Sequence, residues 1–177
     1  CRCWYTFIFF GHNPNLISIL DGGLKKWKRE NKETTNKITN LEKKNYKARK
    51  MTHLVKSKIE INKNIKNKKF KVVDARSKNR FLGIEKEPRS GLISGSIKNS
   101  YCLPFNECID LNKKTFLDKK LIKKKFKKIE INNENNVVFT CGSGVTAAVL
   151  SLAYSLINDK YLPIIYDGSW AEYGKIK

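Results

Sequence analysis

The feature that most constrains this chain is the stretch VVFTCGSGVTAAVLSLAYSL, residues 137–156, in which one cysteine separates two apolar runs. Residues 137–139 predict a short buried strand, and residues 147–156 carry apolar side chains at helical spacing. Cys141 therefore lies at a strand-to-helix turn, directly ahead of a helix N-terminus. Such a turn is typical of α/β folds.

This position favours a reactive cysteine. The attacking form of cysteine is the thiolate, and the free N–H groups and positive dipole end of a helix N-terminus stabilise an anion placed before them. The small residues Gly142, Ser143 and Gly144 allow several backbone N–H groups to turn toward one sulfur, and Thr146 can cap the helix. Most free cysteines are simply buried as small hydrophobic residues, but two glycines in a tight loop favour a nucleophile.

The net charge of +21 does not by itself indicate a nucleic-acid site. Only six of the 37 basic residues are arginine, and 18 asparagines and 18 isoleucines show that the whole chain is biased in composition. The densest basic run, residues 113–128, has nine lysines interleaved with apolar residues and predicts an amphipathic helix with a solvated basic face. We therefore expect no specific nucleic-acid partner.

Membrane and metal functions are also disfavoured. The apolar run at residues 3–10 is too short to cross a bilayer, and no small-residue cleavage site follows it as in a signal peptide. Five cysteines is an odd number, and their spacings match neither a disulfide scaffold nor a zinc site. These features predict a cytoplasmic protein with no membrane contact and no bound metal.

The chain contains two similar segments, ISILDGGLKKWKRE at residues 17–30 and PIIYDGSWAEYGKI at residues 163–176. Asp21 and Asp167 occupy equivalent places in them, and such self-similarity indicates a duplicated unit. Only the end of the first copy is present. We therefore predict a C-terminal remnant of a first domain at residues 1–30, a polar linker at 31–45 and a second domain at 46–177.

Strands alternate with helices in the second domain, and this order predicts a parallel sheet flanked by helices. The predicted strands are residues 70–74, 100–104, 137–139 and 163–166. We expect the strand that leads into Cys141 to be central. Its carboxyl end would then lie at the edge where α/β sheets bind their ligands.

Three longer stretches stand out in this domain: VVDARSKNRFLGIEKEPRSGLISGSI, CLPF, and VVFTCGSGVTAAVL with YDGSWAEYG. They resemble the tandem rhodanese-type sulfurtransferases, and among these the 3-mercaptopyruvate sulfurtransferases. ILDGGLKKW is similar to the end of that family's non-catalytic N-terminal domain. The resemblance implies a rhodanese-like sheet preceded by the remnant of a second rhodanese domain. Because most of that domain is missing, we expect an exposed apolar surface at Trp4, Tyr5, Phe7, Phe9 and Phe10.

The resemblance also implies the chemistry. Cys141 would take the sulfane sulfur of 3-mercaptopyruvate as a persulfide and pass it to cyanide or to a thiol acceptor such as thioredoxin. Ser143 matches a serine that relays protons together with a histidine and an aspartate of the N-terminal domain. Neither His12 nor His53 falls at the matching place. No cofactor is implied.

Two arginines would hold the substrate. By resemblance, Arg80 and Arg89 grip the substrate carboxylate and carbonyl, a task suited to a planar guanidinium fork. Arg76 matches a structural arginine, which we expect to pair with Asp74 or Glu85. The remaining substrate-binding residues implied by the resemblance are Gly142, Gly144, Val145 and Thr146.

Three alternatives remain. Thiosulfate-preferring relatives typically carry charged residues after the cysteine, whereas Gly142 and Ser143 are uncharged, so thiosulfate is the second choice of donor. Cysteine phosphatases also place a cysteine loop before a helix, but they need an arginine six positions after the cysteine, where this chain has Ala147. The last alternative is a catalytically impaired rhodanese module that binds or regulates, since the relay histidine and aspartate are absent.

Overall fold

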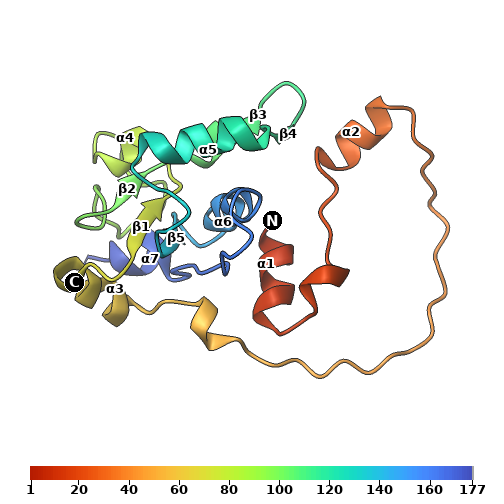
Figure 1. The fold of residues 1–177 in the computed structure, drawn as a ribbon, viewed down its shortest axis with the longest axis horizontal. Helices are drawn as coiled ribbons and strands as arrows, with labels where there is room; N and C mark the ends of the chain where they lie inside the picture. Colours follow the sequence, from red (N-terminus) through yellow and green to blue (C-terminus); the bar gives the residue numbers. More distant parts are fainter. Residues whose placement is uncertain (177) are drawn as a thin grey trace.

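The computed structural model describes residues 1–176 and has the predicted α/β order (Figure 1). The helices are α1 (Arg2–Phe9), α2 (Gly23–Arg29), α3 (Lys58–Asn67), α4 (Lys78–Phe81), α5 (Lys119–Lys128), α6 (Ala147–Ser155) and α7 (Ser169–Tyr173). The strands are β1 (Lys71–Asp74), β2 (Tyr101–Cys102), β3 (Ile109–Asp110), β4 (Thr115–Phe116) and β5 (Val137–Thr140). Short 3₁₀ turns cover Pro14–Leu16, Thr52–Leu54 and Phe105–Cys108.

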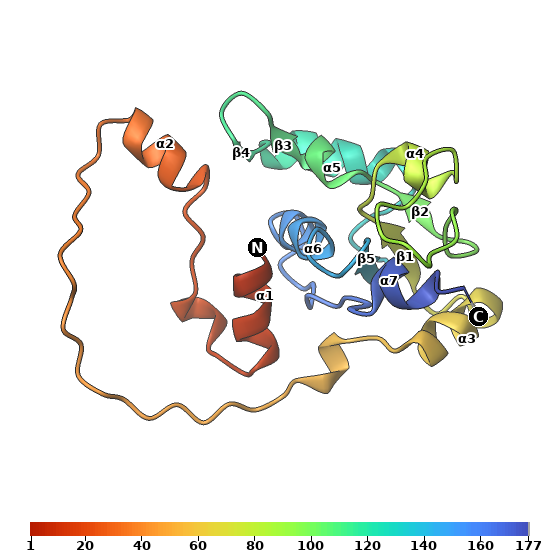
Figure 2. The same ribbon diagram turned by 180° about the vertical axis from the view of Figure 1, so that it is seen from behind.

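The main sheet is parallel, with strand order β2, β1, β5, and helices lie on both of its faces (Figures 1 and 2). Within this ladder β1 lies between β2 and β5, and on the other side of β5 Phe139 bridges Ile165, which in turn bridges Val55. The Cys141 strand therefore has parallel partners on both sides, as expected for a central strand. The strand expected at residues 163–166 is reduced to bridges at Ile165, and Pro163 has no N–H to donate to a longer ladder.

Alternate residues of β5 face opposite sides of the sheet and enter two separate cores. Val137 and Phe139 belong to the core that contains buried residues of α5 and α6, including Phe126 and Tyr154. Val138 belongs to the core on the other face, which includes residues of α3 and α7. All four residues of β5 are buried, which explains why the strand reads as an unbroken apolar run.

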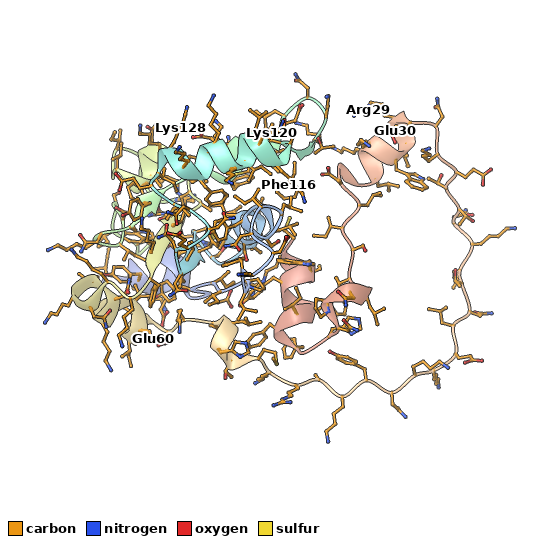
Figure 3. All side chains as sticks on the ribbon, viewed as in Figure 1. Arg29, Glu30, Glu60, Phe116, Lys120 and Lys128 are labelled. Atoms are coloured by element: carbon orange, nitrogen blue, oxygen red, sulfur yellow. The ribbon has the colours of Figure 1, made fainter. Side chains whose placement is uncertain are left out.

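The lysine-rich run forms a helix only in its second part. The side chain of Asp118 accepts a hydrogen bond from the Leu121 N–H (2.9 Å) and caps α5, so the helix begins at Lys119. Residues 111–114 instead form a turn that leads into β4, which pairs antiparallel with β3. The amphipathic character is confirmed: Ile122 and Phe126 are buried, whereas Lys120 and Lys128 point away from the body of the protein (Figure 3).

The N-terminal segment packs against the domain through α1, which lies beside α6 (Figures 1 and 2). Tyr5 is 2% exposed, and its hydroxyl donates to the Leu54 carbonyl at 2.8 Å. The expectation of a fully exposed apolar surface was therefore wrong for Tyr5, and Trp4 and Phe9 pack partly against the same core. Phe7, on the far side of the helix, is 52% exposed.

The segment after α2 makes a wide excursion around the molecule (Figures 1 and 3). Residues 32–50 contain no helix or strand, and each of them is exposed. At the start of this excursion, Arg29 donates to the carbonyls of Asn112 and Lys113, and Asp21 accepts from the Phe116 N–H. These bonds attach α2 to the β3–β4 hairpin. Within residues 1–176, no helix has both the length and the apolar character that crossing a bilayer requires.

Candidate functional site

Cys141 lies at the carboxyl end of β5, where the loop of residues 141–146 leads into α6. The neighbouring strand β1 is parallel to β5, so its carboxyl end lies at the same edge of the sheet. The segment that contains α4 and the loop after it begins at that edge. Cys141 is 2% exposed. The structure therefore brings the cysteine loop and the arginine-rich segment together, as expected from their sequence positions.

The cysteine loop directs one backbone N–H at the sulfur. The N–H of Ser143 donates to Cys141 Sγ at 3.4 Å, the arrangement that stabilises a thiolate. The carbonyls of the loop are held from outside it: Trp170 N–H donates to Cys141 O and Ala171 N–H donates to Gly142 O, each at 2.9 Å. The first turn of α7 thus holds these two carbonyls.

The other end of the loop is held at Gly144. This residue has φ +78°, in the left-handed region that favours glycine. A Cβ at this position would lie 2.3 Å from Asp167 Oδ1 and 2.9 Å from Arg2 Nη1, so the site also lacks room for any side chain. The Gly144 carbonyl accepts a hydrogen bond from Arg2 Nη1 at 3.2 Å.

Arg80 and Arg89 approach the loop at Gly142. Arg89 Nη1 lies 3.4 Å from the Gly142 carbonyl, which accepts a long hydrogen bond from it. A Cβ at Gly142 would lie 3.1 Å from Arg80 Nη2 and 3.7 Å from Arg89 Nη1. Both guanidinium groups therefore border the residue that follows Cys141, and an anion held by them would lie next to the loop.

Glu87 orients Arg80. Its carboxylate accepts from Arg80 Nε and Nη2 and also from Arg76 Nη1, and its side chain is 1% exposed. Burial alone would raise the pKa of Glu87, but the hydrogen bond from Arg80 and the charge of Arg76 outweigh it, and the pKa lies below its usual value. The carboxylate therefore stays ionised at neutral pH and holds Arg80 in place.

Arg76 is a structural residue, as expected. It is buried, donates to both oxygens of Asp74 and lies over the Trp170 ring at 4.4 Å. Its second carboxylate partner is Glu87. Glu85, the other partner considered, accepts a hydrogen bond from the Ser77 hydroxyl. The expectation of a pair with Asp74 is confirmed, and Glu87 was missed because it lies eleven residues along the chain from Arg76.

Val145 and Thr146, the last two residues of the loop, were also expected at the site. Thr146 occupies the residue before α6, but its side chain makes no capping hydrogen bond, so the expected cap was wrong. Its carbonyl accepts from the N–H groups of Val149 and Leu150 instead, because Thr146 already has helical backbone angles. Val145 is 53% exposed and lies at the surface of the loop.

The sequence interpretation missed Arg2 and Asp167 as neighbours of the loop. Arg2 Nη1 donates to Asp167 Oδ1 (2.5 Å) and Nη2 donates to Oδ2 (3.2 Å). A signal was present in the composition, because Arg2 is one of only six arginines among the 37 basic residues of the chain. Asp167 was recognised only as part of the repeated Asp-Gly pair.

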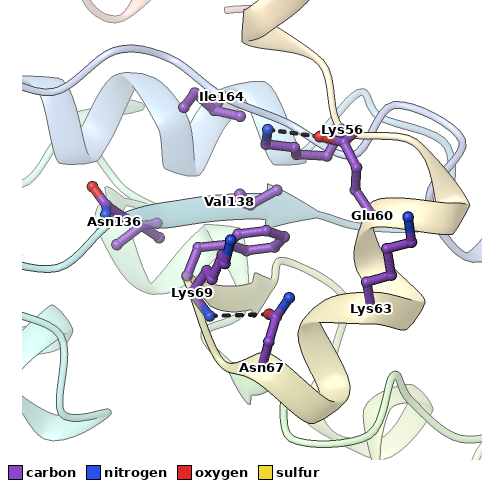
Figure 4. Close-up of a pocket in the computed structure, with 10 residues that line it drawn as sticks. Lys56, Glu60, Lys63, Asn67, Lys69, Asn136, Val138 and Ile164 are labelled. Carbon is purple, nitrogen blue, oxygen red and sulfur yellow. Dashed lines mark hydrogen bonds and ion pairs between the residues drawn. The ribbon is translucent and has the colours of Figure 1, made fainter.

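A separate pocket of about 440 Å³ lies at the opposite end of the sheet (Figure 4). Phe70 and Asn136, which immediately precede β1 and β5, line it together with Val138, Lys63 and Lys69. Lys56, also in its wall, is paired with Glu60. This pocket contains none of the loop residues. Among residues 1–176, no group of three or more His, Cys, Asp or Glu side chains could hold a metal ion.

Comparison with known proteins places these features in a family context. Residues 57–175 match the family model described as a Rhodanese-like domain. The chain is 34% identical over 193 residues to Thiosulfate/3-mercaptopyruvate sulfurtransferase 2 of Arabidopsis thaliana, an alignment that covers 97% of this chain and 55% of that protein. It is 35% identical over 172 residues to 3-mercaptopyruvate sulfurtransferase of Mus musculus, with 97% and 57% covered.

The fold is similar to the crystal structure of the Tum1 protein from Saccharomyces cerevisiae. The TM-score is 0.80 at 25% identity, and the match covers 97% of this chain and 61% of that chain. The chain thus spans a little over half the length of the curated relatives that it matches.

Proposed function

The chain belongs to the rhodanese-like family, and we propose that it is a sulfurtransferase in which Cys141 carries sulfur as a persulfide. The proposed donor is 3-mercaptopyruvate, and the proposed acceptor is cyanide or a thiol such as that of thioredoxin. The observation that supports this best is the convergence of Arg80 and Arg89 on Gly142, directly beside the cysteine whose sulfur accepts the Ser143 N–H.

The first half-reaction forms the persulfide. The Cys141 thiolate attacks the sulfur of 3-mercaptopyruvate and forms an S–S bond, while the C–S bond breaks and its electron pair leaves as the enolate of pyruvate. Arg80 and Arg89 bind the carboxylate and the enolate oxygen, where negative charge develops. Protonation of the enolate carbon gives pyruvate, and we assign the proton relay to the hydroxyl of Ser143.

The second half-reaction regenerates the enzyme. The acceptor thiolate or cyanide attacks the outer sulfur of the persulfide, the S–S bond breaks, and its electron pair returns to Cys141 as the thiolate. The product is an acceptor persulfide or thiocyanate. The loop N–H groups that favour the thiolate at the start also favour it as the leaving group.

Thiosulfate is the second candidate donor. The loop residues Gly142, Ser143 and Gly144 carry no charge, so the cationic groups at the site are the arginines around the loop. Two guanidinium groups beside the loop favour mercaptopyruvate, whose carboxylate and adjacent carbonyl offer one acceptor group to each. A binding or regulatory role without catalysis would leave this arrangement of cysteine, amide and guanidinium groups without a purpose.

The test is mass spectrometry of the protein after treatment with 3-mercaptopyruvate or with thiosulfate. We expect a gain of one sulfur on Cys141, faster with mercaptopyruvate, and no gain in Cys141→Ser. Arg80→Lys and Arg89→Lys should each raise the activation free energy of persulfide formation by roughly 1.5 to 3 kcal/mol, because the point charge of lysine cannot replace the planar guanidinium group.

Lys113→Ala and Lys124→Ala are the matched controls, since each removes one positive charge far from the loop. Their rates should equal that of the unmodified chain. No added sulfur on Cys141 with either donor would contradict the enzymatic proposal and favour a binding module. Unchanged rates in both arginine variants would show that Arg80 and Arg89 do not hold the substrate.

A further inference from the structure

Arg2 reaches the cysteine loop from a distant part of the chain. It belongs to α1, and 142 residues separate it from Gly144, whose carbonyl accepts its hydrogen bond. The same guanidinium is held by both carboxylate oxygens of Asp167, which follows the bridge at Ile165 and precedes α7. One side chain therefore connects the N-terminal helix, the loop and the segment leading into α7.

The Gly144 carbonyl is a sensitive point in the loop. The Cys141 and Gly142 carbonyls are held by the N–H groups of α7, and the bond from Arg2 holds the Gly144 carbonyl farther along the loop. Because Gly144 has φ +78° and glycine resists rotation weakly, an external contact is needed to keep this peptide in one orientation. Loss of that contact would let the amides near the sulfur rotate.

The chemistry of arginine fits this task. The hydrogen bond to Asp167 raises the pKa of Arg2 and outweighs partial burial, with smaller contributions from the charges of Asp167 and Cys141. A fork with several donors can hold the carboxylate and the carbonyl at once, whereas a lysine has a single ammonium group. Arg2 is one of only six arginines in a chain in which lysine supplies most of the positive charge.

We propose that Arg2, held by Asp167, is a positioning residue for the persulfide step: it fixes the Gly144 carbonyl and thereby the course of the loop that presents the Ser143 N–H to Cys141 Sγ. The sulfur chemistry in this inference rests on the proposed function, whereas the loop-fixing contact does not. On this view α1 is a working part of the site, and the N-terminal segment controls the rate of sulfur uptake.

The experiment compares Arg2→Ala, Arg2→Lys and Asp167→Asn in the full 177-residue chain. Hydrogen exchange of the peptide spanning residues 141–147 measures loop order without any need for activity. Single-turnover persulfide formation, followed against mercaptopyruvate concentration, separates the maximal rate from the half-saturating concentration. The matched control is Arg29→Ala, since Arg29 also donates to two backbone carbonyls, but on the β3–β4 hairpin.

In Arg2→Ala we expect hydrogen exchange in the loop to become faster and the maximal rate of persulfide formation to fall, each by roughly tenfold or more. This is the range for losing a hydrogen bond from a charged group. The half-saturating concentration should change little, because Arg80 and Arg89 are untouched. Arg2→Lys should recover part of the rate, Asp167→Asn should resemble Arg2→Ala, and Arg29→Ala should resemble the unmodified chain.

Several results would overturn the inference. One is unchanged hydrogen exchange of the loop in both Arg2→Ala and Asp167→Asn. Another is a lower yield of folded protein with an unchanged rate constant for persulfide formation, because that result would indicate a purely structural role for Arg2. Asp167→Asn leaves α1 intact and decides the question if Arg2→Ala does not fold. If the unmodified chain forms no persulfide, the proposed function fails, and loop exchange alone still tests the positioning role.

Discussion

Glu87 shows how a single residue prepares the site before any substrate arrives. It receives hydrogen bonds from Arg80 and Arg76, and Arg76 is itself bound to Asp74 and packed over Trp170. Ordering a long arginine side chain costs conformational entropy, and here that cost is met on folding and not on binding. Arg80 therefore presents an already oriented guanidinium group beside the cysteine loop.

The cysteines should differ sharply in reactivity for a reason that acts residue by residue. Burial raises the pKa of the Cys102 thiol to about 11 and that of Cys108 to about 12, so both stay protonated and unreactive. Cys141, in contrast, receives the Ser143 N–H at its sulfur. We expect iodoacetamide at mildly acid pH to label Cys141 well before Cys102 or Cys108, as measured by peptide mass spectrometry. Equal labelling of the three would contradict the interpretation of the loop.

At the scale of secondary structure, α5 and α6 form the support on which the Cys141 strand lies. Phe126 of α5 packs against Phe139 of β5 and against Tyr154 of α6, with ring centroids 6.0 and 5.0 Å apart. These contacts hold one face of the strand, and the N–H groups of α7 hold the first two carbonyls of the loop that follows it. The position of Cys141 therefore depends on helices whose own side chains do not enter the reaction.

The cap of α5 gives a direct test of that support. Asp118→Ala removes the side chain that accepts the Leu121 N–H, and we expect a loss of about 1 kcal/mol in the free energy of unfolding. Denaturant unfolding followed by circular dichroism measures it. Asp159→Ala is the control, because it removes the same charge from an exposed position outside any helix. Equal stability of the two variants would show that Asp118 does not cap α5.

For the whole molecule, the question is what encloses the site. The N-terminal segment carries exposed apolar side chains, among them Phe7, Leu16 and Leu24, at 52%, 72% and 58% exposure. Large exposed apolar residues gathered in one segment indicate a surface that another structure covers. We expect the proposed site to admit water on the side that a second domain would cover, and water weakens each electrostatic contact to the substrate.

We therefore expect residues 1–177 alone to form the Cys141 persulfide slowly and to turn over poorly. Joining them to a complete N-terminal rhodanese domain from a relative should raise steady-state turnover, because the second wall excludes water and supplies relay partners for Ser143. Initial rates of pyruvate release measure the difference. If the 177-residue chain is already as fast and remains monomeric, an active site shared between two domains is the wrong description.

The parts of this protein that depend on short stretches of chain could be predicted from local patterns. The strand, the glycine loop and the helix around Cys141 follow from apolar periodicity and turn chemistry, which act over a few residues. Arg80 and Arg89, for which the resemblance implies substrate binding, lie beside Gly142, and their binding of substrate stays a prediction. The basic face of α5 could be predicted from the spacing of its lysines and apolar residues, but the start of the helix at Lys119 could not.

The distant groups that contact the loop could not be predicted from local patterns, because they come together only in the folded chain. Arg2 and Asp167 are 165 residues apart, and they meet because α1 packs beside α6 and the bridge at Ile165 brings the start of α7 to the same edge. The bridge that brings Ile165 beside β5 and the shared carboxylate of Glu87 also depend on contacts between distant elements. Local patterns state which residues form a helix or strand, but contacts between distant elements depend on how the buried faces fit together, and no short stretch encodes that fit.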